Sequence, residues 1–206
     1  MASSRERRRS LQDIAMQQGG YFTAHQALGI GYVYPRQHYH VQNGDWERVA
    51  RGVFRLHGYP QQEWGDLIVL SLLSHDRAGK PQATISHETA LAFHQLGDAN
   101  PARIHLTVPP GFRRQMLALV VLHYARLEKD DWEEHEGFRV TTPLRTLLDI
   151  ATSPTGWPYL ASAVRDALHQ GVVRSRQLTT ASLPSDAKSH LSEAITEASE
   201  KAGVEQ

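Results

Sequence analysis

Hydrophobic positions near the start of the chain recur at helical spacing. Leu11, Ile14 and Ala15 share one helical face, and a pair of glycines ends this first helix. The next segment begins a second, short helix, because Thr23 at the N-cap and Gln26 three residues later form a capping box. The pattern therefore predicts two consecutive helices before residue 30.

The pattern then changes from helical spacing to alternation. A third helix is expected over residues 34–43, with a proline tolerated in its first turn. Residues 46–49 and 53–56 alternate between apolar and polar positions around a turn that contains Gly52, which is typical of a β-hairpin. Three helices followed by a hairpin is the order of a winged helix-turn-helix.

The rest of the chain mixes helical and strand-like segments. Ser86 and Thr142 stand at expected N-caps, the second followed by a proline. We expect an α+β fold, with a winged helix-turn-helix over 1–60, a mixed helix/strand domain over 61–183 and a polar tail or loosely docked helix over 184–206. The expected helices are 63–74, 86–94, 142–151, 157–170 and a short one from 175, and the expected strands are 103–108, 119–124 and a hairpin within 132–141.

The zero net charge of the chain divides into two opposite parts. Residues 1–60 carry eight basic residues, all arginine, against four acidic ones, so their net charge is +4 and that of the remainder is −4. Arginine matches the geometry of phosphate and guanine better than lysine does, which favours an anion-binding module at the N-terminus. A solvated basic face formed by chance clustering is the alternative.

The third helix is the expected reading element for DNA, because a recognition helix places its exposed side chains against base edges in the major groove. Its register is open, although Tyr39 and Val41 look like inward-facing anchors. The hairpin arginines would contact phosphates or the minor groove. The candidate DNA-binding residues are Tyr34, Arg36, Gln37, His38, His40, Gln42, Arg48, Arg51 and Arg55.

Composition excludes several other classes of protein. The chain has no cysteine, so it has neither disulfides nor thiolate metal sites, and a reduced cytoplasmic location fits best. The apolar runs are far shorter than the ~20 residues that span a bilayer, and the basic N-terminus does not read as a secretory signal. We expect no cofactor and no membrane partner.

The twelve histidines form no recognisable metal motif. His87 and His94 are seven residues apart rather than four, and His38 and His40 lie on different helical faces. Ser86 before His87 reads as an N-cap rather than a nucleophile. We therefore expect neither a metal site nor catalytic residues.

A run of acidic residues is a separate candidate for chemistry, and a nuclease is an alternative because similar N-terminal modules are joined to nuclease domains in other proteins. The carboxylates of residues 128–136 could bind a divalent cation or mimic nucleic acid, although such a run is more often a solvated loop. Arg145 and Asp149, four residues apart, read as a structural ion pair. The alternatives to a DNA-binding regulator are thus a nuclease with a winged-helix targeting module and an adaptor that binds only proteins.

Four segments resemble the AbiEi family of antitoxins and transcriptional regulators from type IV toxin–antitoxin systems. They are residues 20–24 before the short helix, residues 48–56 in the hairpin, the Ser-His-x-x-Ala segment 86–90, and the Thr-x-x-x-Arg-Thr-Leu-Leu-Asp segment within 140–151. The matches run in order from about residue 10 to about residue 180.

The resemblance implies a repressor that autoregulates its operon by binding inverted repeats with its winged helix. It also implies an antitoxin that counters a nucleotidyltransferase-like toxin without requiring a stable complex. Inverted repeats need two reading heads, so a homodimer or two adjacent monomers are expected.

Overall fold

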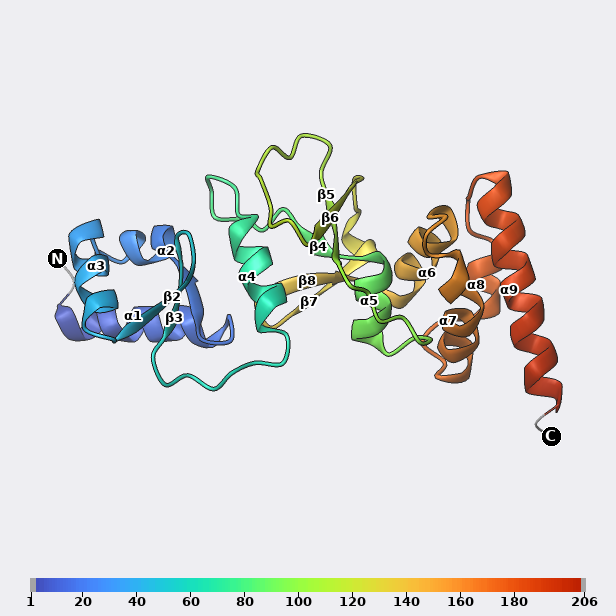
Figure 1. Cartoon of the computed structure of the whole chain (residues 1–206), viewed down its shortest axis with the longest axis horizontal. Coiled ribbons are helices and arrows are strands. Elements are labelled where there is room, and N and C mark those ends of the chain that lie inside the picture. Colours follow the sequence, from blue (N-terminus) through green and yellow to red (C-terminus); the bar gives the residue numbers. More distant parts are fainter. Residues whose placement is uncertain (1–2, 205–206) are drawn as a thin grey trace. The chain divides into compact units, whose positions relative to one another are not determined.

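The structure is a computed structural model that describes residues 3–204, with side chains as far as Glu200. It divides into two compact units. Figure 1 labels the helices and strands. The N-terminal unit comprises Met1–Ala83, Phe112–Met116 and Glu134–Arg139. The C-terminal unit comprises Thr84–Gly111, Leu117–Glu133 and Val140–Gln206. The N-terminal unit thus includes segments beyond residue 60.

The N-terminal unit contains the three helices and the hairpin that the sequence predicts. The Thr23 hydroxyl accepts a hydrogen bond from the Gln26 amide, and the Gln26 side chain accepts one from the Thr23 amide, which confirms the capping box. Its elements are α1 (Ser4–Met16), β1 (Tyr21–Thr23), α2 (Ala24–Gly29), α3 (Tyr34–Gln42), β2 (Trp46–Ala50), β3 (Val53–Leu56) and α4 (Gly65–Leu73).

A small antiparallel sheet closes this unit, in the strand order β1-β3-β2. The short strand β1 is the addition that hydrophobic alternation did not predict. Phe22 on β1 meets the rings of Trp46 and Phe54 at centroid distances of 4.9 and 5.8 Å. Leu11 and Ala15 of α1 cover this aromatic core, which holds the hairpin against the helices.

The C-terminal unit is built on strands of a mixed sheet in the order β6-β5-β4-β8-β7, and the hairpin turn between β7 and β8 belongs to the N-terminal unit. Strand β4 runs antiparallel to β5 and parallel to β8, while β5 and β6 are parallel. The strands are β4 (Thr84–Ile85), β5 (Ile104–Val108), β6 (Val120–Tyr124), β7 (Trp132–His135) and β8 (Phe138–Thr141). The chain is therefore α+β, as expected.

Helices form the other part of this unit and share one apolar core around Leu147, Ile150 and Val164. The Thr142 hydroxyl accepts from the Arg145 amide, which confirms this N-cap. Ser86 occupies an N-cap position without making a capping bond. The helices are α5 (His87–His94), η1 (Lys129–Asp131, a 3₁₀ turn), α6 (Pro143–Thr152), α7 (Trp157–His169), α8 (Ser175–Thr179) and α9 (Ser185–Val204).

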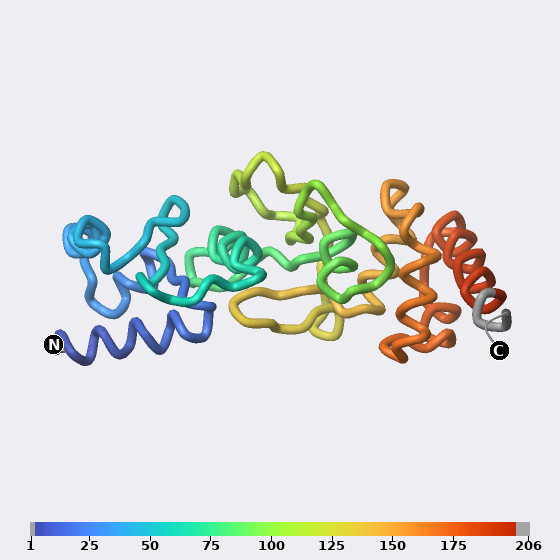
Figure 2. The backbone as a smooth tube through the Cα atoms, turned by 60° about the horizontal axis from the view of Figure 1, so that its bottom comes forward, coloured from blue at the N-terminus to red at the C-terminus, as the bar shows by residue number. Residues whose placement is uncertain are grey.

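The C-terminal segment is a docked helix rather than a polar tail. Helix α9 lies beside α7 (Figure 2) and buries Ala187, Leu191, Ala194 and Ala198 in the shared core. These residues follow helical spacing, but three of the four are alanines, so the hydrophobic signal in the sequence is weak. Within residues 3–204, no helix combines the length and the apolar character needed to cross a bilayer.

Candidate nucleic-acid interface

Much of the surface of helix α3 is exposed to solvent. Its exposed side chains include Tyr34, Arg36, His38 and Gln42. The Arg36 guanidinium lies 5.8 Å from the centre of the Tyr32 ring, near the start of the helix. These exposed side chains extend from the first residue of α3 to its last.

Gln37 is a structural residue, which corrects its assignment as a base-reading side chain. It is 2% exposed, and its amide nitrogen donates to the carbonyls of Ala24 at 3.0 Å and Tyr32 at 2.7 Å. Both bonds fasten α3 to the preceding helix and loop. Sequence reasoning missed this role because a buried glutamine in a short polar helix gives no hydrophobic signal.

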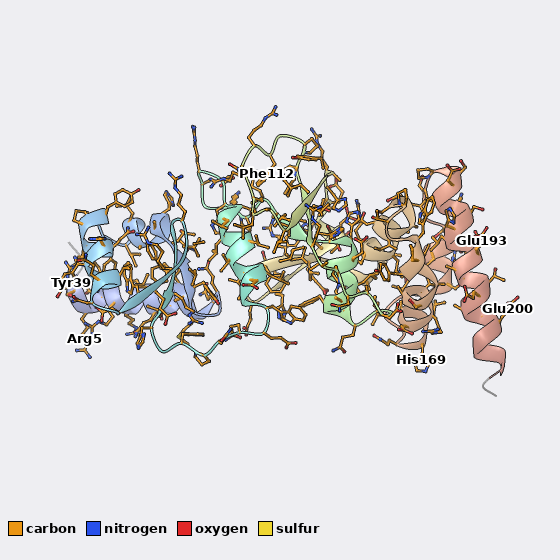
Figure 3. All side chains as sticks on the ribbon, viewed as in Figure 1. Arg5, Tyr39, Phe112, His169, Glu193 and Glu200 are labelled. Carbon is orange, nitrogen blue, oxygen red and sulfur yellow. The ribbon has the colours of Figure 1, made fainter. Side chains whose placement is uncertain are left out.

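His40 and Tyr39 have orientations opposite to those expected: Tyr39 faces solvent, and His40 faces the protein. Tyr39 is 57% exposed and is labelled on α3 in Figure 3, so it is not an inward anchor. His40 has only 19% of its side chain exposed, stacks on Trp46 at 4.9 Å, and lies 2.8 Å from the Asp45 carboxylate. His40 therefore positions the turn after α3 and is not available to DNA, whereas Tyr39 is.

The three hairpin arginines differ in availability. Arg51 is exposed at the turn, and Arg48 is exposed with its guanidinium 5.5 Å from the centre of the Phe54 ring. Arg55 instead makes an ion pair of 2.6 Å with Glu47, and 20% of its side chain is exposed. The hydrogen bond to Glu47 raises the pKa of Arg55, so this guanidinium is committed within the hairpin.

One residue connects the two candidate reading elements. The amide of Ala24 donates to the carbonyl of Gly52 in the hairpin turn at 2.8 Å, and its carbonyl accepts from Gln37 of α3 at 3.0 Å. The start of α2 thereby links α3 to the hairpin turn. This arrangement gives the exposed residues of both elements fixed relative positions.

The charge of the N-terminal unit favours an anionic ligand. Its sequence contains thirteen Lys and Arg against nine Asp and Glu, a net charge of +4, and the C-terminal unit carries −4. The asymmetry found in the sequence thus follows the structural division. A positive surface attracts nucleic acid over a distance of about the Debye length, ~8 Å at physiological salt.

The C-terminal unit holds a cluster of ionisable residues that the sequence did not indicate. A Glu88 carboxylate oxygen lies 2.8 Å from Nδ1 of His105, and that nitrogen lies 3.1 Å from Nε2 of His123. The ring of His87 stacks on His123 at 3.5 Å. Strands β5 and β6 and the start of α5 contribute these side chains, which are far apart in sequence.

The pKa values of this cluster favour a structural role. Burial and the neighbouring His123 lower the pKa of His87 to about 3, so His87 is neutral at pH 7. Burial opposes ionisation of Glu88, but the hydrogen bond from His105 and other favourable interactions outweigh it and lower its pKa to about 2. Among the residues that the structure describes, no group of His, Asp or Glu has a geometry that could hold a metal ion.

Ser86 and the acidic run also have structural partners. Ser86 is fully buried, accepts from the Thr107 hydroxyl at 2.8 Å and contacts His87 at 3.0 Å. Within the run, Asp131 pairs with Arg145 at 3.0 Å. Arg145 also pairs with Asp149 at 2.8 Å, which confirms the ion pair expected from their spacing.

Comparison with known proteins identifies the C-terminal half. Residues 82–193 match the family described as the AbiEi antitoxin C-terminal domain. The fold is similar to that of the Rv2827c protein from Mycobacterium tuberculosis, with a TM-score of 0.61 and 14% identity over 93% of this chain and 76% of that one. No curated protein sequence matches the chain. The family match spans more than half of the chain, which therefore belongs to the AbiEi antitoxin family.

Proposed function

We propose that this AbiEi-family protein is a DNA-binding transcriptional repressor and the antitoxin of a type IV toxin–antitoxin pair. The N-terminal unit acts as a winged helix-turn-helix, with α3 as recognition helix and the β2–β3 hairpin as wing. The observation that carries the proposal is the Ala24 connection, since it joins an exposed arginine-bearing helix face to an exposed arginine-bearing turn.

The two elements have separate tasks in this proposal. Arg36 lies at the start of α3, where a recognition helix meets base edges, and a guanidinium can bind guanine through two hydrogen bonds. Arg48 and Arg51 on the wing bind phosphates, which adds affinity without sequence preference. The other side chains offered to DNA are Tyr34, His38, Tyr39 and Gln42.

The C-terminal unit carries the antitoxic role, as the family match supports. Its partner is a nucleotidyltransferase-like toxin, which it counters without the need for a stable complex. The repressor acts on inverted repeats in its own promoter, which two copies of the reading head occupy together. We infer a binding role rather than a catalytic one, because the buried carboxylates of the C-terminal unit have structural partners: Glu88 lies against His105, and Asp131 and Asp149 pair with Arg145.

A binding titration tests the proposal. The full chain is titrated with a fluorescent duplex from upstream of its own coding sequence, at several salt concentrations, and with a shuffled duplex of equal length. We expect tighter binding to the upstream duplex and a linear fall of log K with log salt concentration. Equal affinity for both duplexes would contradict the repressor, and binding that does not depend on salt would contradict phosphate contacts.

A growth assay tests the antitoxic role independently of DNA binding. The adjacent toxin gene is expressed together with either the wild-type chain or the full-length variant Leu147→Asp, which places a charge in the buried core of the C-terminal unit. We expect rescue of growth by the wild-type chain only, because a charge in this core disrupts the C-terminal unit. Persistent toxicity with the wild-type chain would contradict the proposal.

A further inference from the structure

A second group of basic residues borders the hairpin turn. The groove concerned lies entirely within the N-terminal unit, between the hairpin turn with the start of α2 on one side and the end of α4 with the following loop on the other. Arg51, Arg77 and Arg114 line it, and each comes from a different segment of the chain. All three are exposed.

The loop after α4 has a defined conformation that displays Arg77. The Asp76 side chain accepts hydrogen bonds from the amides of Ala78 at 2.8 Å and Lys80 at 2.9 Å, and the Asp76 amide donates to the Lys80 carbonyl. Asp76 is the acidic residue of the groove, and these bonds lower its pKa. Its carboxylate therefore neutralises part of the positive charge while it shapes the turn that carries Arg77.

Arg114 reaches the groove from a segment that the sequence places far away. Phe112, labelled in Figure 3, is 5% exposed and anchors residues 112–116 in the N-terminal unit. One guanidinium nitrogen of Arg114 donates to the Leu73 carbonyl at 3.4 Å. An arginine has five N–H groups, so this contact leaves most of them for a ligand.

The remaining lining does not favour a small anion. Burial and the nearby Arg114 lower the pKa of His75, which is therefore neutral at pH 7 and adds no positive charge. Leu72 and Leu73 contribute apolar surface. The three guanidinium groups stand on separate segments along an open groove, an arrangement that suits a chain of phosphates better than one compact anion.

We propose that this groove continues the DNA-binding surface, with Arg77 and Arg114 binding phosphates of the duplex that flanks the half-site. The inference rests on the proposed repressor function, because the groove begins at the wing residue Arg51 and includes Tyr34 at the start of α3. The ligand is the DNA backbone, so these contacts add affinity and fix the orientation of the head without reading sequence.

The test uses the full chain, an upstream duplex that extends beyond the inverted repeat, and the double variant Arg77→Gln/Arg114→Gln. Each phosphate contact contributes about 0.9 to the slope of log K against log salt concentration, so we expect the slope to become shallower by about 1.8. Affinity for a shuffled duplex should fall by the same factor. The double variant Arg77→Lys/Arg114→Lys should restore most of the slope, because lysine also binds phosphate.

Matched controls come from the C-terminal unit. Arg103 is exposed and, like Arg114, donates to one backbone carbonyl, that of Ala118 at 3.2 Å; Arg126 is exposed like Arg77. The double variant Arg103→Gln/Arg126→Gln removes the same charge and should leave the slope unchanged. Thermal unfolding of each variant verifies that the N-terminal unit remains folded.

The possible outcomes separate the two proposals. If Arg36→Ala weakens binding but the Arg77/Arg114 variant keeps the wild-type slope, the groove proposal is wrong and the repressor remains. If the control variant lowers the slope equally, the effect is one of total charge and the groove proposal is wrong. If the groove variant loses only toxin neutralisation, the groove serves a protein partner and the proposal is overturned. If the wild-type chain binds no DNA, both proposals fail.

Discussion

Gln37 of α3 donates its side-chain amide to the carbonyl of Ala24 at 3.0 Å, and this bond ties the candidate recognition helix to the residue that also holds the hairpin turn. A second bond from the same nitrogen reaches Tyr32 at 2.7 Å. This buried polar side chain thus helps to fix the position of α3 relative to the hairpin, together with the stacking of His40 on Trp46. Its neighbour Arg36 points to solvent, so adjacent residues have different tasks.

This difference predicts opposite consequences for two substitutions. Gln37→Leu removes the donor to two carbonyls, so we expect the free energy of unfolding to fall by about 1–3 kcal/mol. Arg36→Ala should leave stability within about 0.5 kcal/mol and weaken binding to the operator by about 1–3 kcal/mol. Urea unfolding and binding titrations, both at 10 °C, measure the two quantities.

The same pair of variants provides the control. At a temperature where Gln37→Leu remains folded, it should keep the wild-type preference for the operator over a shuffled duplex, whereas Arg36→Ala should lose part of it. A Gln37→Leu protein that is fully stable but has lost sequence preference would contradict this division of tasks between the two residues.

The elements of the N-terminal unit were largely predictable because their signals are local. A capping box at Thr23 and alternation around Gly52 depend on neighbouring residues only, and both are present. The outward face of α3 was not predictable, because nearly all of its residues are polar or aromatic. Stacking of His40 on Trp46 and the bonds of Gln37 decide the register, and both are tertiary contacts.

The groove and the histidine cluster could not be predicted from the sequence, because their residues come from distant parts of the chain. Arg114 belongs to the N-terminal unit although twenty-eight residues of the other unit separate it from Ala83. His105 and His123 are neighbours because β5 and β6 are parallel strands with Thr107 opposite His123. No spacing rule along one chain indicates such pairs without the strand order.

Arg145 forms ion pairs with both Asp131 and Asp149, and this predicts that substitutions at Arg145 and Asp149 have non-additive effects on the stability of the C-terminal unit. Arg145→Met leaves Asp149 buried without its cation, so we expect a loss of about 2–3 kcal/mol. This lies below the range for fully buried pairs because 23% of the Arg145 side chain is exposed. Adding Asp149→Asn to Arg145→Met should recover at least half of the loss.

The pH dependence of Asp149 gives an independent measurement. Burial raises the pKa of Asp149 to about 6 against the attraction of Arg145. A raised carboxyl pKa in the folded state means that the wild-type chain gains stability as pH falls from about 6 towards 3.8. Asp149→Asn has no carboxyl group to protonate, so it does not gain this stability. The free energy of unfolding of the variant, relative to that of the wild type, should therefore be higher at pH 8 than at pH 4.5. Urea unfolding at both pH values measures this, and an unchanged difference would contradict the assignment.

The lowered pKa of His87 predicts that the protein loses stability as pH falls, which is opposite to the effect of Asp149. Its folded pKa of about 3 lies below the ordinary value of 6.5, so the unfolded chain binds a proton first as pH falls. Between pH 7.5 and 5.5 this lowers the free energy of unfolding of the wild type by about 1.4 kcal/mol. His87→Asn should remove that part of the dependence, and asparagine suits the backbone there because φ is +53°.

The difference between the wild type and His87→Asn gives the contribution of His87 to the pH dependence of stability. Asp149 titrates in the same interval but is present in both, so its contribution cancels in the difference. Glu88, with a pKa of about 2 in the folded state, loses its stabilising charge only below about pH 4.5, outside the interval. Parallel pH profiles for wild type and His87→Asn would contradict this assignment, because they would mean that folding leaves the pKa of His87 at its ordinary value.

Arg51 and Arg55 both lie on the hairpin and carry the same charge, but we expect them to contribute differently to DNA binding. Arg51 is exposed at the turn, so Arg51→Ala should weaken binding to operator and shuffled duplexes alike and make the salt slope shallower by about 0.9. Arg55 is held by Glu47 at 2.6 Å, so Arg55→Ala should change the slope by less than half as much. It should also lower the free energy of unfolding by about 0.5–1 kcal/mol, because Glu47 then loses its arginine partner and keeps only the exposed His57 at 3.5 Å. Salt titrations with both duplexes and urea unfolding measure these effects.

Equal slopes for the two variants would mean that Arg55 leaves Glu47 to bind phosphate. The hairpin would then present three arginines to DNA instead of two.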